Sequence, residues 1–138
     1  MLSKFGIKVL WAGWRDDPRI GFSSSGYNQW KDKIMVGTRM LIYEAADPRP
    51  EYSSPGIKSI MAEVQVTKMF DEVKGQTAPN QEHEHLILVD ILRKRDSVPP
   101  IPLRRIRALI QNTIFPFQST YLTLEEDVYN LLLKEWER

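Results

Sequence analysis

The middle of the chain holds three segments with the pattern of β-strands, and the residues that join them do not resemble helices. The three segments span residues 39–45 (RMLIYEA), 57–70 and 86–92 (LILVDIL), and they are rich in apolar and β-branched side chains. Residues 47–56 contain three prolines and a glycine, and residues 71–85 are mostly polar, so both connections are expected to be loops. Because parallel strands need a long crossover connection, we expect these three strands to pair antiparallel.

The second of these segments, residues 57–70, has the clearest alternation of apolar and polar residues in the sequence. Side chains that alternate along a strand point to opposite faces of the sheet. One face would carry Ile60, Ala62, Val64 and Val66, and the other would carry Glu63, Gln65 and Thr67. We therefore expect a long strand with one buried face and one face in water.

Shorter elements are expected before this central part of the chain. Residues 4–11 alternate like a first strand. Residues 13–26 contain a proline and three glycines, so we expect a loop there. A short helix over residues 27–36 would follow, with Ser24 or Ser25 as its N-cap.

The C-terminal part of the chain adds two helices and a short strand. Pro102 is suited to begin a helix over residues 103–110, and residues 119–122 are expected to form a final strand. The sequence Thr123-Leu-Glu-Glu126 has the pattern of a capping box, which opens a closing helix. Together these elements predict one α+β domain over residues 1–138, with a small, curved, mostly antiparallel sheet or open barrel and peripheral helices.

Composition excludes several classes of protein. The chain has 138 residues and no cysteine, which excludes disulfide staples, a thiol nucleophile and a cysteine-ligated zinc site. It has no apolar run near the ~20 residues of a membrane span, and residues 1–13 lack the long apolar core of a signal peptide. We expect a soluble, cytoplasmic protein that does not enter a membrane.

Few residues offer catalytic chemistry. His83 and His85 are spaced to share a metal ion on a strand, but they lie in a polar stretch that we expect to be a solvated loop. Asp16 and Asp17 are adjacent carboxylates followed by Pro18, a pattern that is more typical of a turn than of an acid–base pair. The chain also lacks the glycine-rich motifs that bind phosphate. We therefore expect no enzymatic activity, no cofactor and no metal site.

Basic residues are concentrated in two segments, although the net charge is only +1. Residues 1–39 carry 7 basic and 3 acidic side chains, and residues 93–122 carry 6 basic and 1 acidic. If folding brings the two segments together, they form one basic face for a polyanion. The alternative is that these charges are solvated and have no partner.

Aromatic residues accompany the first basic segment. Five aromatic and four basic residues lie between positions 11 and 33, namely Trp11, Trp14, Phe22, Tyr27, Trp30, Arg15, Arg19, Lys31 and Lys33. Aromatic rings stack on bases and cations contact phosphates, so this combination is typical of nucleic-acid binding. Trp30 falls on the apolar stripe of the expected helix, which favours a core position. Trp14, Phe22 and Tyr52 fit a core position and a binding site equally well.

Five short stretches occur in a characteristic order along the chain. They are Arg19-Ile-Gly-Phe-Ser-Ser24, Met40-Leu-Ile-Tyr-Glu-Ala45 after the Val36-Gly37 turn, Gly56 to Val64 with its Ala-Glu-Val ending, Leu103-Arg-Arg-Ile-Arg107, and Thr123-Leu-Glu-Glu126. In order and spacing they resemble the EVE and YTH domains of the PUA-like group, and the fourth matches the L-R-x-I-R pattern of YTH domains. The resemblance spans nearly the whole chain. It implies a PUA-like fold and a non-catalytic protein that binds DNA or RNA with a modified base.

The resemblance also implies roles for particular residues. In this group a flipped base, often methylated, sits in an aromatic cage near the first strand and the loop that follows. Phe22 matches the first wall of the cage, where YTH domains carry tryptophan, and Ser23 matches the serine beside it. Arg104 and Arg107 match the arginines whose basic edge contacts phosphate. The expected base pocket comprises Trp11, Trp14, Phe22, Ser23, Ser24 and Tyr52, and the expected phosphate contacts are Arg15, Arg19, Lys31, Arg104, Arg105 and Arg107.

A competing hypothesis involves no nucleic acid. The proline-rich segments 48–55 and 99–102 would then be contact loops of a small-ligand or protein-interaction module, and the basic residues would be incidental. Binding to nucleic acid weakens steeply as the salt concentration rises. A bound protein displaces cations from the phosphates, and this displacement becomes less favourable when the solution already contains many cations. The salt dependence of binding therefore separates the two hypotheses.

Overall fold

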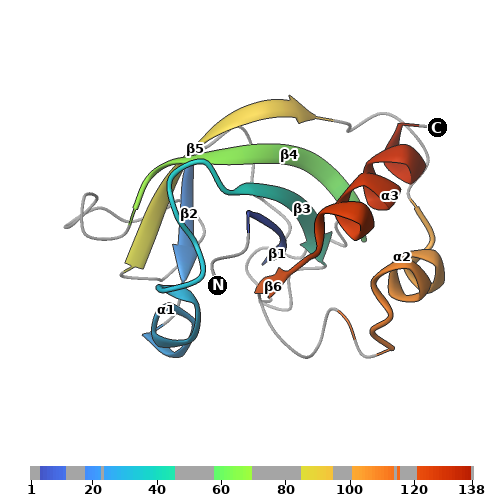
Figure 1. Cartoon of the computed structure of the whole chain (residues 1–138), viewed down its shortest axis with the longest axis horizontal. Coiled ribbons are helices and arrows are strands. Elements are labelled where there is room, and N and C mark those ends of the chain that lie inside the picture. Colours follow the sequence, from blue (N-terminus) through green and yellow to red (C-terminus); the bar gives the residue numbers. More distant parts are fainter. Residues whose placement is uncertain are drawn as a thin grey trace, which may run out of the picture.

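A computed structural model describes residues 4–11, 18–22, 24–45, 58–69, 85–94, 101–113, 115 and 121–137 (Figure 1). The strands and helices of this part of the chain are, in order, β1 (Phe5–Trp11), β2 (Arg19–Phe22), α1 (Ser24–Trp30), β3 (Arg39–Ala45), β4 (Ser59–Lys68), β5 (His85–Lys94), α2 (Leu103–Ile110), β6 (Tyr121–Thr123) and α3 (Glu126–Trp136). The bounds predicted for β3 and α2 agree with the structure at both ends.

The strands form one curled sheet in the order β2-β5-β4-β3-β1-β6. All neighbours in this sheet are antiparallel except β1 and β3, which are parallel. The α1 helix lies at one end of the sheet, and α2 and α3 lie together at the other end (Figure 1). The expected α+β fold with a small, curved, mostly antiparallel sheet and peripheral helices is confirmed, as is the antiparallel pairing of β3, β4 and β5.

The sheet is buried on both faces, which explains the nearly continuous apolar run of β3. Met40 and Ile42 belong to one hydrophobic cluster, on the side of the sheet that also holds β2 and α1. Leu41 and Tyr43 belong to a second cluster, which α2 and α3 cover with side chains such as Trp136. Alternate residues of one strand therefore serve two different cores, as the twofold periodicity of a strand requires.

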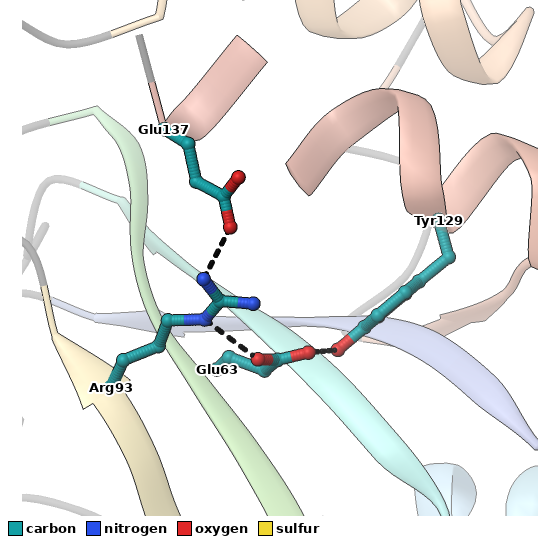
Figure 2. Close-up of polar contacts among 4 residues, drawn as sticks. All are labelled: Glu63, Arg93, Tyr129 and Glu137. Carbon is teal, nitrogen blue, oxygen red and sulfur yellow. Dashed lines mark hydrogen bonds and ion pairs between the residues drawn. The ribbon is translucent and has the colours of Figure 1, made fainter. Parts of the chain in front are cut away.

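A buried carboxylate joins α3 to the sheet. The Tyr129 hydroxyl donates a hydrogen bond of 2.6 Å to Oε2 of Glu63, and Nε of Arg93 donates one of 2.9 Å to Oε1 (Figure 2). Arg93 also pairs with Glu137 at the end of α3. Glu63 is only 2% exposed, so the expected water-facing side of β4 is wrong at this position. The second core covers that face of the sheet, and the carboxylate keeps its hydrogen bonds from two side chains instead of water.

Two expectations about the N-terminal part of the chain are wrong. The expected loop over residues 13–26 contains β2, whose four residues pair with the edge of β5. A strand this short has too few residues to show an alternating pattern. The helix α1 ends at Trp30 instead of continuing to residue 36. Ile34 is nevertheless buried, so the apolar spacing that predicted a longer helix arises from a turn that packs on the core.

The predicted capping box also does not form. Thr123 is the last residue of β6 and pairs with Gly6, while Glu125 occupies the N-cap position of α3 without a capping hydrogen bond from its side chain. Pairing in the sheet holds Thr123 away from the helix.

Within the described residues, no helix is both long enough and apolar enough to cross a lipid bilayer.

Candidate functional site

The two edge strands of the sheet, β2 and β6, meet through aromatic side chains. The ring centroids of Phe22 on β2 and Tyr121 on β6 are 6.2 Å apart, and those of Tyr121 and Trp30 on α1 are 5.1 Å apart. Because β2 and β6 stand at opposite ends of the strand order, the sheet has curled until side chains close the gap between its edges. We call Lys8, Phe22, Trp30 and Tyr121 the seam.

Lys8 places a cation inside this aromatic group. Its side chain extends from β1, is 2% exposed, and holds Nζ 4.5 Å from the centroid of the Phe22 ring. Nζ donates one long hydrogen bond, 3.4 Å, to the carbonyl of Val9, and no carboxylate of the described residues forms an ion pair with it. Burial disfavours the charged ammonium and lowers the pKa of Lys8 to about 7.

The local sequence of β1 forces this arrangement. Lys8 pairs with Ile42 on one side and with Tyr121 on the other, and both of these residues lie in the first core. Gly6, two residues earlier on the same face, makes room for the tyrosine ring. A Cβ atom at Gly6 would lie 2.1 Å from Oη of Tyr121, which is far inside contact distance. Glycine at this position therefore allows the seam to form.

The seam also contains a second buried hydrogen-bond donor. Trp30 is 8% exposed, and its indole Nε1 has no hydrogen-bond acceptor in the described part of the chain. Buried donors are almost always satisfied, and each exception calls for a physical explanation. The indole N–H and the ammonium of Lys8 are among the buried donors of the seam that an acceptor-bearing ligand can satisfy.

A second aromatic contact adjoins the seam. His85 is the first residue of β5 and pairs directly with Phe22 of β2, so the prediction that it lies in a loop is wrong. Its ring stacks on Tyr27 of α1, with centroids 4.0 Å apart and planes inclined by 8°. Lys31, which follows α1, holds Nζ 5.5 Å from the centroid of Tyr27. His83 lies outside the described residues, and no group of three or more candidate metal ligands occurs within them.

The residues predicted for the base pocket are only partly within the described structure. Phe22 is 1% exposed and belongs to the core, so in this conformation it does not present an open wall. Trp30 is in the core, as expected. Trp14, Ser23 and Tyr52 lie outside the described residues. Trp11 and Ser24 are placed only by their backbones, in β1 and α1. For Trp11, Trp14, Ser23, Ser24 and Tyr52, a position in the base pocket stays a prediction.

Three of these residues, Trp11, Trp14 and Tyr52, occur at or after the carboxyl ends of β1 and β3, which pair in parallel. Trp11, at the carboxyl end of β1, pairs with Ala45 at the carboxyl end of β3. The two strands therefore end side by side at the same edge of the sheet. Trp14 follows the first of these ends after two residues, and Tyr52 follows the second after six.

Arg19 and Lys31 of the first basic segment lie far from the arginines of α2 (Figure 1). Arg19 lies on β2 and Lys31 follows α1, whereas α2 lies at the opposite end of the sheet (Figure 1). On α2, Arg105 binds Glu135 of α3 through Nε and Nη2 at 3.0 and 2.7 Å, and Nε of Arg107 donates to the carbonyl of Phe115 at 2.5 Å. The guanidinium groups of both arginines therefore bind acceptors of the protein itself. Arg104 is exposed, and Arg15 lies outside the described residues.

Sequence reasoning missed Lys8, Tyr121 and His85. The alternation of residues 4–11 places apolar side chains such as Phe5 and Ile7 at the odd-numbered positions and so predicts one buried face. In the structure the even-numbered residues of β1 face a core of their own. The signal for this lies in Leu10, an apolar residue on the face expected to be polar. A strand that is buried on both faces does not display which polar residue points inward.

Comparison with known proteins gives a match only at the level of structure. No family model matches the chain, and no curated protein matches it. Among solved structures, the crystal structure of the Pho92 YTH domain in complex with m6A is similar to this chain, with a TM-score of 0.61 and 6% sequence identity. The similarity covers 98% of this chain and 85% of that chain. It shows that the two chains share a fold.

Proposed function

We propose that this protein is a non-catalytic reader of nucleic acid that takes up an extruded, modified base at the seam. Support comes from the fold, which is shared with a YTH domain crystallised with m6A over 98% of the chain. The observation that carries the proposal is the seam itself, where two buried donors, Lys8 and the Trp30 indole, lie among aromatic rings. A base offers what this site lacks, namely flat π faces and ring or carbonyl acceptors at its edge.

Lys8 decides how a base would enter. In the free protein the lysine lies over the face of Phe22 that a base would need for stacking. With a pKa of about 7, about half of the molecules carry a neutral amine at pH 7, so moving the side chain costs little electrostatic energy. The base then takes the ring face, and the displaced amine donates to an acceptor at the base edge.

We assign the remaining contacts to the other residues predicted for the base pocket. Ser24 is the first residue of α1 and Ser23 precedes it in the sequence, while Trp11, Trp14 and Tyr52 occur in the sequence at or after the ends of the paired strands β1 and β3. We assign the phosphate contacts to Arg15, Arg19 and Lys31, which belong to the same part of the sequence. Arg105 and Arg107 are left out of this set because they bind Glu135 and the carbonyl of Phe115.

The energies set the expected behaviour. Extruding a base costs a few kcal/mol, and stacking on aromatic side chains returns about 1–3 kcal/mol for each base. The two terms nearly offset each other, so phosphate contacts must supply the net affinity. Binding should therefore be salt-dependent, strongest for single strands, and weak for a duplex without the modification.

Binding of a fluorescein-labelled nine-nucleotide RNA with one central m6A, followed by anisotropy, tests the proposal. Unmodified RNA and the two corresponding DNA strands provide the comparison, each at several salt concentrations. We expect tighter binding of a modified strand, and Lys8→Met should weaken it at least fivefold. Lys134→Met, which removes an exposed lysine of α3, is the matched control and should leave affinity unchanged. Equal and salt-independent binding of all four strands would contradict the proposal and favour a small-ligand or protein-interaction module.

A further inference from the structure

The stacked pair of Tyr27 and His85 continues the aromatic seam toward the surface. His85 lies opposite Phe22 in the antiparallel pairing of β2 with β5, and residues in opposite positions have side chains on the same face of a sheet. The rings of Tyr27 and His85 are nearly parallel and 4.0 Å apart. A row of aromatic side chains therefore runs from Tyr121 through Phe22 and His85 to Tyr27.

This outer pair differs from the inner part of the row in its exposure and charge. Phe22 and Tyr121 are buried, whereas Tyr27 and His85 are each only partly buried. Lys31 is exposed, and its ammonium lies 5.5 Å from the centroid of the Tyr27 ring. Partly exposed rings with an exposed cation beside them combine the two features that bind single-stranded nucleic acid, which are π faces for bases and positive charge for phosphates.

We propose that Tyr27 and His85 form a stacking platform for the nucleotide next to the extruded base, and that Lys31 binds the phosphate of that nucleotide. This inference rests on the proposed function and adds a second base-binding position to it. The ligand is single-stranded nucleic acid, because a neighbouring base held in a duplex has both faces covered by its own stack. The platform does not read the identity of this base, since every base has a π face.

An abasic nucleotide beside m6A tests the platform directly. The nine-nucleotide RNA is prepared with m6A and an intact neighbour, and with an abasic residue on its 5′ or its 3′ side. The wild-type protein should bind one of the two abasic strands about tenfold more weakly than the intact strand. Tyr27→Leu should weaken binding of the intact strand by a similar factor and leave binding of that abasic strand unchanged, while Tyr27→Phe should behave like the wild type.

Two further variants separate stacking from charge. Lys31→Gln should lower the slope of log affinity against log salt by about 0.7, the value for one phosphate contact on a single strand, and Lys134→Gln should not alter it. Thermal unfolding by circular dichroism checks that each variant is folded at the assay temperature. If the wild-type protein prefers m6A but binds both abasic strands as tightly as the intact strand, the platform is refuted and the proposed function stands. If no strand shows a preference for m6A, the proposed function itself has failed.

Discussion

Lys8 should make the stability of this protein rise with pH in a range where most proteins show little change. The ammonium is 2% exposed, and burial lowers its pKa from the ordinary 10.5 to about 7. At about 1.4 kcal/mol for each pKa unit, this difference corresponds to about 5 kcal/mol of stability that the charged lysine costs the folded state.

The sign follows from counting protons. Between pH 7 and pH 10.5 the unfolded chain keeps a proton on Lys8 that the folded protein has released, so the free energy of unfolding rises with pH. Below pH 7 both states bind the proton, and the contribution of Lys8 is constant. From pH 7 to pH 9.5 the wild-type protein should therefore gain about 3 kcal/mol from this residue.

Urea unfolding of wild-type protein and Lys8→Met, followed by tryptophan fluorescence at pH 6, 7, 8, 9 and 9.5, measures this gain. The unfolding free energy of the variant minus that of the wild type should be largest at pH 6 to 7 and shrink by about 3 kcal/mol at pH 9.5. Burial also raises the pKa of Tyr121 and Tyr129, which lowers stability as the pH rises above 10. This effect is common to both proteins and cancels in the difference.

Lys134→Met serves as the control, because that lysine is exposed on α3 and its ammonium is solvated in both states. Its unfolding free energy should run parallel to that of the wild type at every pH. A difference between Lys8→Met and wild type that stays constant from pH 6 to 9.5 would refute the reasoning. It would mean that the amine reaches water or an acidic partner in the folded protein.

Three other substitutions should affect stability to different degrees, each measurable by urea unfolding at pH 7. Gly6→Ala should lower the free energy of unfolding by about 1–3 kcal/mol or more, because the new Cβ would lie far inside contact distance of the Tyr121 hydroxyl. An unchanged urea midpoint would contradict this close approach. Tyr129→Phe should cost about 1–3 kcal/mol, since the carboxylate of Glu63 then loses its 2.6 Å hydrogen bond, and a loss below 0.5 kcal/mol would show that water replaces the hydroxyl. Arg105→Gln should cost less than about 1 kcal/mol, because its ion pair with Glu135 lies at the surface; a larger loss would mean that this pair is shielded from water.

The sequence was sufficient where one local pattern decided the structure. Residues 39–45 and 103–110 were predicted at both ends because a proline or a glycine precedes each segment and the apolar pattern within it is clear. Glu63 was misplaced because its burial depends on α3, which is more than sixty residues away in the sequence. Lys8 was missed for the same reason, since its surroundings come from β2, β3 and β6. The residues of the seam come together only because the sheet curls, and no local sequence pattern predicts this.

The way in which the sheet closes supports the proposal that a ligand enters at the seam. β3, β4 and β5 are seven to ten residues long, and each has a hydrogen-bonded neighbour on both sides. β2 and β6 have only four and three residues, and each pairs on one side only. Between these two edges the described contacts are made by side chains. One of these side chains is Lys8, whose charged form is disfavoured by burial. Local opening begins where the fewest hydrogen bonds and the weakest packing must be given up. Under the proposed function, a base that enters at the seam would displace side chains and leave the backbone ladder of the sheet intact.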